Sequence, residues 1–117
     1  MTVRGLLPLA GLLALSLLVA CEQKPPTERL TNAEIAGEWL YDNNCAPCHE
    51  NPQPDLHKQP PNLHGLFLRQ SLPSGEPATD ADVRKTIIEG HGTMPAFDQR
   101  LRQVDVNNLV KYLHTLR

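Results

Sequence analysis

Two cysteines and a histidine stand close together in the first half of the chain. Cys45 and Cys48 are separated by two residues and His49 follows directly, which is the spacing used for covalent attachment of a c-type haem. Thiols at positions i and i+3 reach the two vinyl groups on one edge of a porphyrin, and the adjacent imidazole can bind the iron. The pattern predicts one covalent haem c, with thioethers at Cys45 and Cys48 and an axial ligand at His49.

Two other kinds of site use a pair of cysteines at this spacing. A thioredoxin-like disulfide follows a strand and has no need of His49, whereas no strand-like run precedes Cys45. A structural zinc site takes four ligands, usually from two such pairs, and the chain contains one pair. Haem is the interpretation that uses all three residues, and the disulfide and the metal site remain as alternatives.

A haem iron held by one histidine needs, or leaves open, a sixth ligand. Met94 is the only methionine besides Met1, and it follows His49 by about 45 residues in a stretch flanked by glycines and a proline, which predicts a loop. A lone methionine is more often part of a core, but a loop offers little reason for that. A thioether ligand favours the reduced iron and raises its potential. We therefore expect Met94 to be the distal ligand.

The remaining histidines are weaker candidates for the iron. His91 is the second choice because it precedes Met94 by three residues. His57, His64 and His114 are more simply explained as surface side chains.

The first 20 residues have the pattern of an export signal. Arg4 supplies one positive charge, the run from 6 to 19 is almost entirely apolar, and small residues precede Cys21. A retained membrane anchor would need roughly 20 apolar residues. The Leu-Val-Ala-Cys sequence resembles the bacterial lipobox, which implies cleavage before Cys21 and lipid attachment there; an ordinary signal peptide with an incidental cysteine is the alternative. Residues 21–30 are polar and contain two prolines, as a tether would.

Length and charge exclude several classes of protein. A chain of 117 residues has room for one small domain, here residues 31–117, and excludes a large multidomain enzyme. The formal charge is −2 and no basic run is present, which argues against nucleic-acid binding. Of the first 20 residues 14 are apolar, against about a third of the rest, so the domain is short of core material. A covalently held haem would fill that core.

The first helix of this domain is predicted to begin just after residue 30. Thr31 and Glu34 have the spacing of a capping box. Apolar residues then follow at helical steps: Ile35, Trp39 and Leu40. Gly37 lies inside this helix, where glycine is less favourable than alanine by about 1 kcal/mol. Close approach of another helix would explain Gly37, and a tolerated accident is the alternative.

Two further helices follow, and proline-rich loops at 51–62 and 71–78 lie between the haem motif and the first of them. Thr79 is placed to cap the second helix and Gly90 to end it. Its apolar residues share one face: Val83, Ile87 and Ile88. The last helix is predicted over roughly 104–116, although no Ser, Thr or Asn precedes Arg102 to mark its start. Its apolar residues recur at steps of three and four: Val106, Leu109, Val110, Leu113 and Leu116.

Nearly the whole of this domain resembles the small monohaem cytochromes c of class I. The similar segments are the helix and haem motif at 37–49, the run that begins at Pro61 and the loop that begins at Met94. The resemblance implies an all-α fold, in which three main helices and loops wrap around one covalent haem. It also implies that the Pro61 carbonyl accepts a hydrogen bond from the second ring nitrogen of His49, and that Arg69 lies near a haem propionate.

These features together predict an exported electron carrier rather than an enzyme. An iron with a histidine and a methionine ligand cannot bind a substrate, so the expected partners are a redox donor and a redox acceptor, with no small-molecule substrate. The protein would be a lipoprotein on a membrane, facing the periplasm or the cell exterior, either free or as a fixed subunit of a membrane oxidoreductase. The alternative is a haem-based sensor of small ligands, in which Met94 leaves the iron and His91 acts in the distal pocket.

Overall fold

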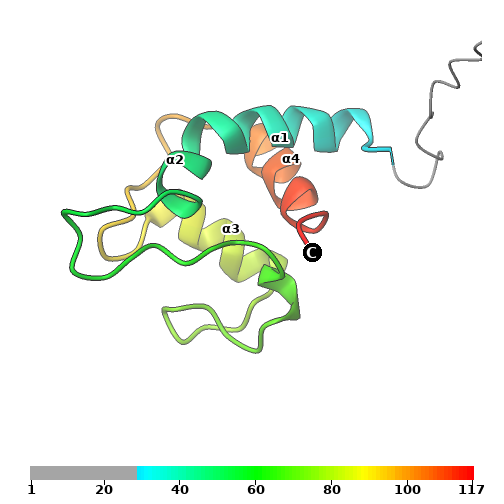
Figure 1. Ribbon diagram of the computed structural model, residues 1–117. Helices are drawn as coiled ribbons and strands as arrows, with labels where there is room; N and C mark the ends of the chain where they lie inside the picture. The colour runs from blue at the N-terminus through cyan, green and yellow to red at the C-terminus, as the bar shows by residue number, and fades with distance from the viewer. Residues whose placement is uncertain (1–28) are drawn as a thin grey trace, which may run out of the picture.

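A capped helix begins the described part of the protein, which is residues 29–117 of a computed structural model (Figure 1). Helix α1 spans Asn32–Asn44. The hydroxyl of Thr31 accepts from the Glu34 N–H at 3.3 Å, and the Thr31 N–H donates to the Glu34 carboxylate at 2.6 Å. The predicted capping box is confirmed. The predicted leader and Cys21 lie outside the described residues.

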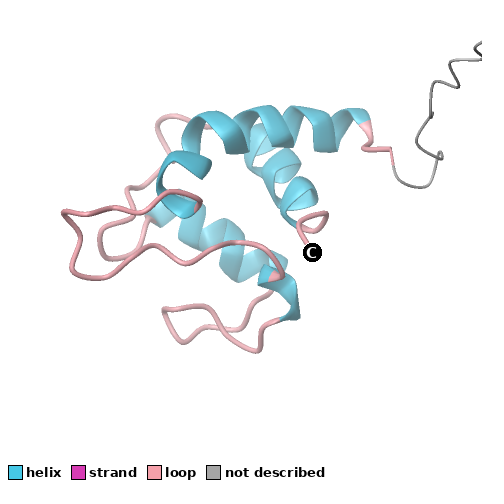
Figure 2. Ribbon diagram, in the orientation of Figure 1, coloured by secondary structure: helices cyan, strands magenta, loops and turns pink. Residues whose placement is uncertain are grey.

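Helices and loops make up the rest of residues 29–117, with no strand among them (Figure 2). After α1 come the one-turn helix α2 (Ala46–His49), the 3₁₀ helix η2 (Leu66–Leu68), α3 (Asp80–Glu89) and α4 (Gln103–Leu113). The expected all-α fold with three main helices is confirmed. No helix in the described range has both the length and the apolar character needed to cross a bilayer.

The predicted limits of α3 are correct. Thr79 caps the helix through a hydrogen bond from the Asp82 N–H at 3.2 Å. At the other end Gly90 adopts a φ of 76° and donates its N–H to the Thr86 carbonyl at 2.8 Å. Both signals act within four residues, which is why the sequence reveals them.

Helix α4 differs from its prediction at both ends. It begins after Arg102, whose N–H and guanidinium both donate to the Asp105 carboxylate, at 2.9–3.0 Å. It ends at Leu113, three residues before the predicted limit, because the Thr115 hydroxyl and N–H both donate to the Tyr112 carbonyl, at 2.7 and 2.8 Å. Such local bonds replace the helical pattern and turn the chain.

The closest packing in the fold is the crossing of α1 and α4, which lie against each other in Figure 1. A Cβ atom on Gly37 would lie 2.1 Å from the Asn108 carbonyl oxygen and 2.7 Å from the Tyr112 Cβ. The rings of Tyr41 and Tyr112 meet beside it, with centroids 5.3 Å apart. Gly37 therefore has the packing reason that the sequence analysis sought.

This crossing also decides which side of α1 is buried. Gly37, Leu40 and Tyr41 face the interior. Ile35 and Trp39, which the helical spacing grouped with Leu40, are instead 51% and 66% exposed. The spacing identified the helix correctly, but it did not identify the inward face, because the position of the glycine sets the contact with α4.

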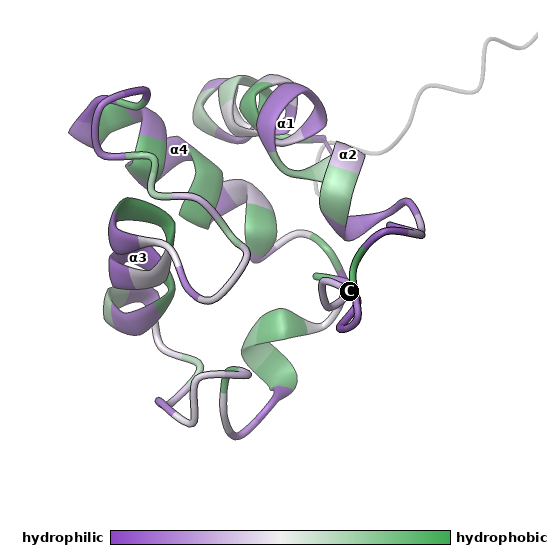
Figure 3. Ribbon diagram, turned by 90° about the vertical axis from the view of Figure 1, so that its left-hand side faces the viewer, coloured by the Kyte–Doolittle hydropathy of each residue, from purple (hydrophilic) through white to green (hydrophobic). Residues whose placement is uncertain are grey.

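The interior is apolar, and no polar or charged side chain within residues 29–117 is buried. Helices α3 and α4 turn much of their apolar surface toward the centre of the domain (Figure 3). The buried residues are Leu40, Tyr41, Leu66, Leu72, Val83, Ile87, Phe97, Val106, Leu109, Val110, Tyr112 and Leu113. Side chains from α1, α3 and α4 all contribute to this core. Cys45 and Met94 are partly buried and pack against it.

Candidate haem site

The cysteine motif occupies the junction between α1 and α2. Cys45 ends α1 and begins α2, and its carbonyl accepts the N–H groups of Cys48 at 3.1 Å and His49 at 2.9 Å. This turn places the three side chains on adjoining positions of one helical surface. Both cysteines are free thiols, Cys45 half-buried and Cys48 exposed. Burial raises the pKa of the Cys45 thiol to about 12.

His49 is oriented by the loop that follows it. Its Nδ1 atom lies 2.7 Å from the Pro61 carbonyl oxygen. A carbonyl only accepts hydrogen bonds, so Nδ1 carries the proton and Nε2 keeps its lone pair. The contact expected with Pro61 is present, and it leaves Nε2 as the ring atom suited to bind a metal.

Arg69 holds that loop in place. Its guanidinium donates to the carbonyl oxygens of Asn62 at 2.5 Å and His64 at 3.1 Å. The chain from Pro61 onward is thereby closed into a turn, which fixes the carbonyl that His49 contacts. The resemblance to class I cytochromes implied a place for Arg69 near a haem propionate, and no local pattern indicated this tie to the backbone.

Met94 lies on a tight turn directly after α3. His91 and Met94 exchange backbone hydrogen bonds at 2.9 and 3.1 Å. A Cβ atom on Gly90 would lie 2.6 Å from the Met94 carbonyl oxygen, so the turn folds back against the end of α3. The Phe97 N–H donates to the Ile87 carbonyl at 3.1 Å, which anchors the far side of the turn. The Met94 side chain is half-buried against the core.

All four other histidines are exposed, as expected for His57, His64 and His114. His114 lies 2.7 Å from the Asp80 carboxylate and stacks on Phe67 with ring centroids 3.7 Å apart. His64 is paired at 3.8 Å with Glu50.

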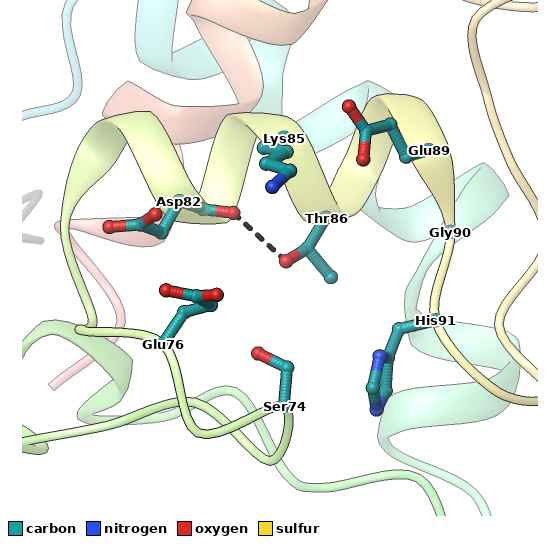
Figure 4. A pocket seen from close by; sticks show the side chains of 8 residues that line it. All are labelled: Ser74, Glu76, Asp82, Lys85, Thr86, Glu89, Gly90 and His91. Carbon is teal, nitrogen blue, oxygen red and sulfur yellow. Dashed lines mark hydrogen bonds between the residues drawn. The ribbon is translucent and has the colours of Figure 1, made fainter.

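The second-choice ligand, His91, borders a polar recess of about 300 Å³ between α3 and the loop at 71–78 (Figure 4). Side chains of Glu76, Asp82, Lys85 and Glu89 also line this recess. No group of three metal-binding side chains occurs within residues 29–117. The recess therefore has no ligand set of its own for a metal ion.

Glu50 has a structural role that no sequence pattern indicated. Its carboxylate accepts a hydrogen bond from the Tyr41 hydroxyl at 2.8 Å and so ties the residue next to His49 back to α1. Burial, with the help of this bond, raises the pKa of Tyr41 well above its usual value. Tyr41 and Glu50 lie on either side of the end of α1, and no local sequence pattern links them. Only the position of Glu50 beside His49 could have suggested a role for it.

The residues present fit a covalent haem. Two unlinked thiols lie one turn apart, beside an imidazole whose proton is held at Nδ1. The core that Cys45 packs against also carries apolar side chains that are only partly buried: Leu63, Phe67, Ile88, Met94 and Leu101. A porphyrin needs this combination of attachment points, an iron ligand and an apolar lining.

Comparison with known proteins agrees with this chemistry. Residues 32–113 match the family described as "Cytochrome C oxidase, cbb3-type, subunit III". The chain is similar to cytochrome c of Kluyveromyces lactis, with 30% identity over 75% of this chain and 94% of that protein. It is also similar to the cbb3-type cytochrome c oxidase subunits FixP of Rhizobium etli (35% identity, 69% of this chain) and CcoP of Azospirillum brasilense (37% identity, 76% of this chain).

The lengths of these relatives differ. The chain covers 27% of the Rhizobium subunit and 31% of the Azospirillum subunit, whereas it covers almost all of the yeast cytochrome c. The helical fold, the motif from Cys45 to His49 and these matches identify the chain as a member of the c-type cytochrome family, which carries electrons on one covalent haem c.

Proposed function

We propose that the protein is an exported single-electron carrier whose haem iron is ligated by His49 and Met94. The observation that carries the proposal is the 2.7 Å contact between His49 Nδ1 and the Pro61 carbonyl, which leaves Nε2 for the iron. Met94 supplies the only thioether within the described residues. The turn that carries it is anchored to the core on both sides.

The haem supplies a reversible one-electron change at its iron. The chain contributes geometry. Pro61 holds the proton at Nδ1 of His49 and, as an acceptor, makes the imidazole a stronger donor through Nε2. Met94 would supply the second protein ligand to the iron and so leave no iron position open to a small molecule. No general acid or base is required, so an electron can pass with little rearrangement.

Replacement of Met94 tests the ligand assignment. Met94→Ala should keep the haem attached, abolish the methionine-to-iron charge-transfer band of the oxidised protein, lower the potential and let the reduced protein bind CO. The matched control is His91→Ala, which should change none of these. An unchanged spectrum and potential in Met94→Ala, or loss of the band in His91→Ala, would show that the sixth ligand is misassigned. Prompt CO binding by the unmodified protein at neutral pH would instead support the ligand sensor.

The N-terminal segment completes the proposal. Residues 1–20 would direct export, Cys21 would carry the lipid and residues 21–30 would tether the haem domain, residues 31–117, to the membrane. Multiple acyl chains anchor a protein stably where a single chain does not. Cys21→Ser should move the holoprotein from the membrane fraction to the soluble fraction. Retention of that variant in salt-washed membranes would contradict the lipid anchor.

The proposed partners are redox proteins on both sides of the electron path. Two relatives are named as subunits of an oxidase, which supports a place in or beside a membrane oxidoreductase. The match to nearly the full length of a cytochrome c supports a free carrier. Purification from gently solubilised membranes separates the two, because a fixed subunit would elute with a larger complex at constant stoichiometry and a carrier would elute alone.

A further inference from the structure

Helix α1 presents an exposed apolar pair to solvent. Ile35 and Trp39 lie one turn apart and are 51% and 66% exposed. Trp39 is the only tryptophan in the chain. Tryptophan is among the residues that contribute most to binding at protein interfaces. Together with Glu38 and Asp42, these two residues form what we call the α1 outer face.

The rest of the described fold leaves Ile35, Trp39 and Asp42 of the α1 outer face exposed and Glu38 half-buried. With about 100° between successive helical residues, Trp39 lies about 160° around the axis from Gly37, the residue that touches α4. The side-chain amide of Asn43 donates to the Trp39 carbonyl at 2.7 Å, so this bond lies on the same stretch of α1. The covalent motif therefore lies at one end of a helix whose outer side is free.

Carboxylates border the apolar pair. Glu38 and Asp42 make no ion pair within residues 29–117, and α1 itself contains no lysine or arginine. The first acidic residue of the helix, Glu34, is different: it belongs to the capping box, and Lys111 of α4 acts on it. The α1 outer face thus combines an apolar centre with two uncompensated negative charges on one side.

We propose that the α1 outer face docks a protein partner that offers an apolar recess rimmed by lysine or arginine. This inference rests on the proposed carrier function, which requires such partners. Charge decides against the other occupants. A second copy would bring four carboxylates together, and a bilayer with anionic lipids would repel Glu38 and Asp42. A basic rim would pair with both carboxylates and speed the encounter.

The position of the α1 outer face suits electron transfer. Trp39 precedes Cys45 by six residues on the same helix, about 9 Å along the axis. A partner seated on Trp39 would therefore lie beside the helix end that carries the haem attachment.

Docking kinetics test the proposal. The reduced full-length holoprotein, in mild detergent, is oxidised by solubilised membranes from a strain of the source organism that lacks it. Trp39→Ala should raise KM about tenfold with kcat and potential unchanged, as expected for loss of a central aromatic anchor. The double variant Glu38→Gln/Asp42→Asn should raise KM about threefold and reduce its dependence on ionic strength. Val104→Ala, at another exposed apolar residue, is the matched control and should change nothing.

Each outcome has a distinct meaning. An unchanged KM for Trp39→Ala, alongside a wild-type protein that is oxidised, overturns the docking proposal alone. If Trp39→Ala instead weakens binding to protein-free vesicles of phosphatidylethanolamine with some phosphatidylglycerol while KM is unchanged, the face contacts the membrane and the proposal is wrong. Wild-type protein that exchanges no electrons with the membranes in either direction overturns the carrier function, and the docking proposal with it.

Discussion

The crossing of α1 and α4 can be tested with one methyl group. A Cβ atom at Gly37 would lie 2.1 Å from the Asn108 carbonyl oxygen and 2.7 Å from the Asn108 carbonyl carbon. Since the blocking atoms belong to the backbone, the helices must separate by roughly 1 Å to reach an ordinary contact. Overpacking of this kind costs up to about 3 kcal/mol, and the better helix propensity of alanine returns about 1 kcal/mol.

We therefore expect Gly37→Ala to reduce the free energy of unfolding of the holoprotein by about 2 kcal/mol, which corresponds to a fall in Tm of roughly 10 °C. Denaturant unfolding, followed by far-ultraviolet circular dichroism and by haem absorbance, measures the change. Asn32→Ala, at an exposed position of the same helix, is the control and should stay within about 0.5 kcal/mol of wild type. A Gly37→Ala protein as stable as wild type, or more stable, would refute the close crossing.

Two further predictions concern a turn and a helix end. In Gly90→Ala the alanine must adopt a φ of 76°, and its methyl group would lie 2.6 Å from the Met94 carbonyl oxygen, so the methionine-to-iron charge-transfer band should weaken. Gly92→Ala is the control, because Gly92 has a φ of 57° but open space around it. This variant carries the backbone strain alone and should keep the band. Equal loss of the band in both variants would rule out the steric explanation. Hydrogen bonds from Arg102 lower the pKa of the Asp105 carboxyl, so its contribution to stability is complete above the ordinary carboxyl pKa of about 4 and is lost as the pH falls through the lower, folded value. The Asp105→Asn variant should be less stable than wild type at neutral pH, and the difference in unfolding midpoint should shrink in acid; a constant difference would contradict this origin.

Signals that act over a few residues were predictable from the sequence. Thr31, Thr79 and Gly90 mark helix ends through bonds that span three or four residues, and the structure places these ends as predicted. The start of α4 was not recognised, because Arg102 is not a usual capping residue and works here through Asp105.

Contacts between segments were harder to predict. The tie between Tyr41 and Glu50 and the grip of Arg69 on two carbonyls join residues that no local pattern relates. The contact between His49 and Pro61 was expected only because the chain resembles a family in which it occurs.

The sequence by itself determined the chemistry of the haem attachment, since two thiols and an imidazole within five residues are close in any helical turn, and it determined where most helices begin and end. The apolar faces predicted for α3 and α4 are also buried, whereas tertiary structure decided which side of α1 is buried. In α1 the apolar spacing grouped Ile35 and Trp39 with Leu40, yet the absence of a side chain at Gly37 lets α4 approach from the side opposite Trp39, and Ile35 and Trp39 stay exposed. Helical periodicity identifies a buried face where the apolar residues form one clear stripe, but in α1 the steric fit between two helices selects the buried face.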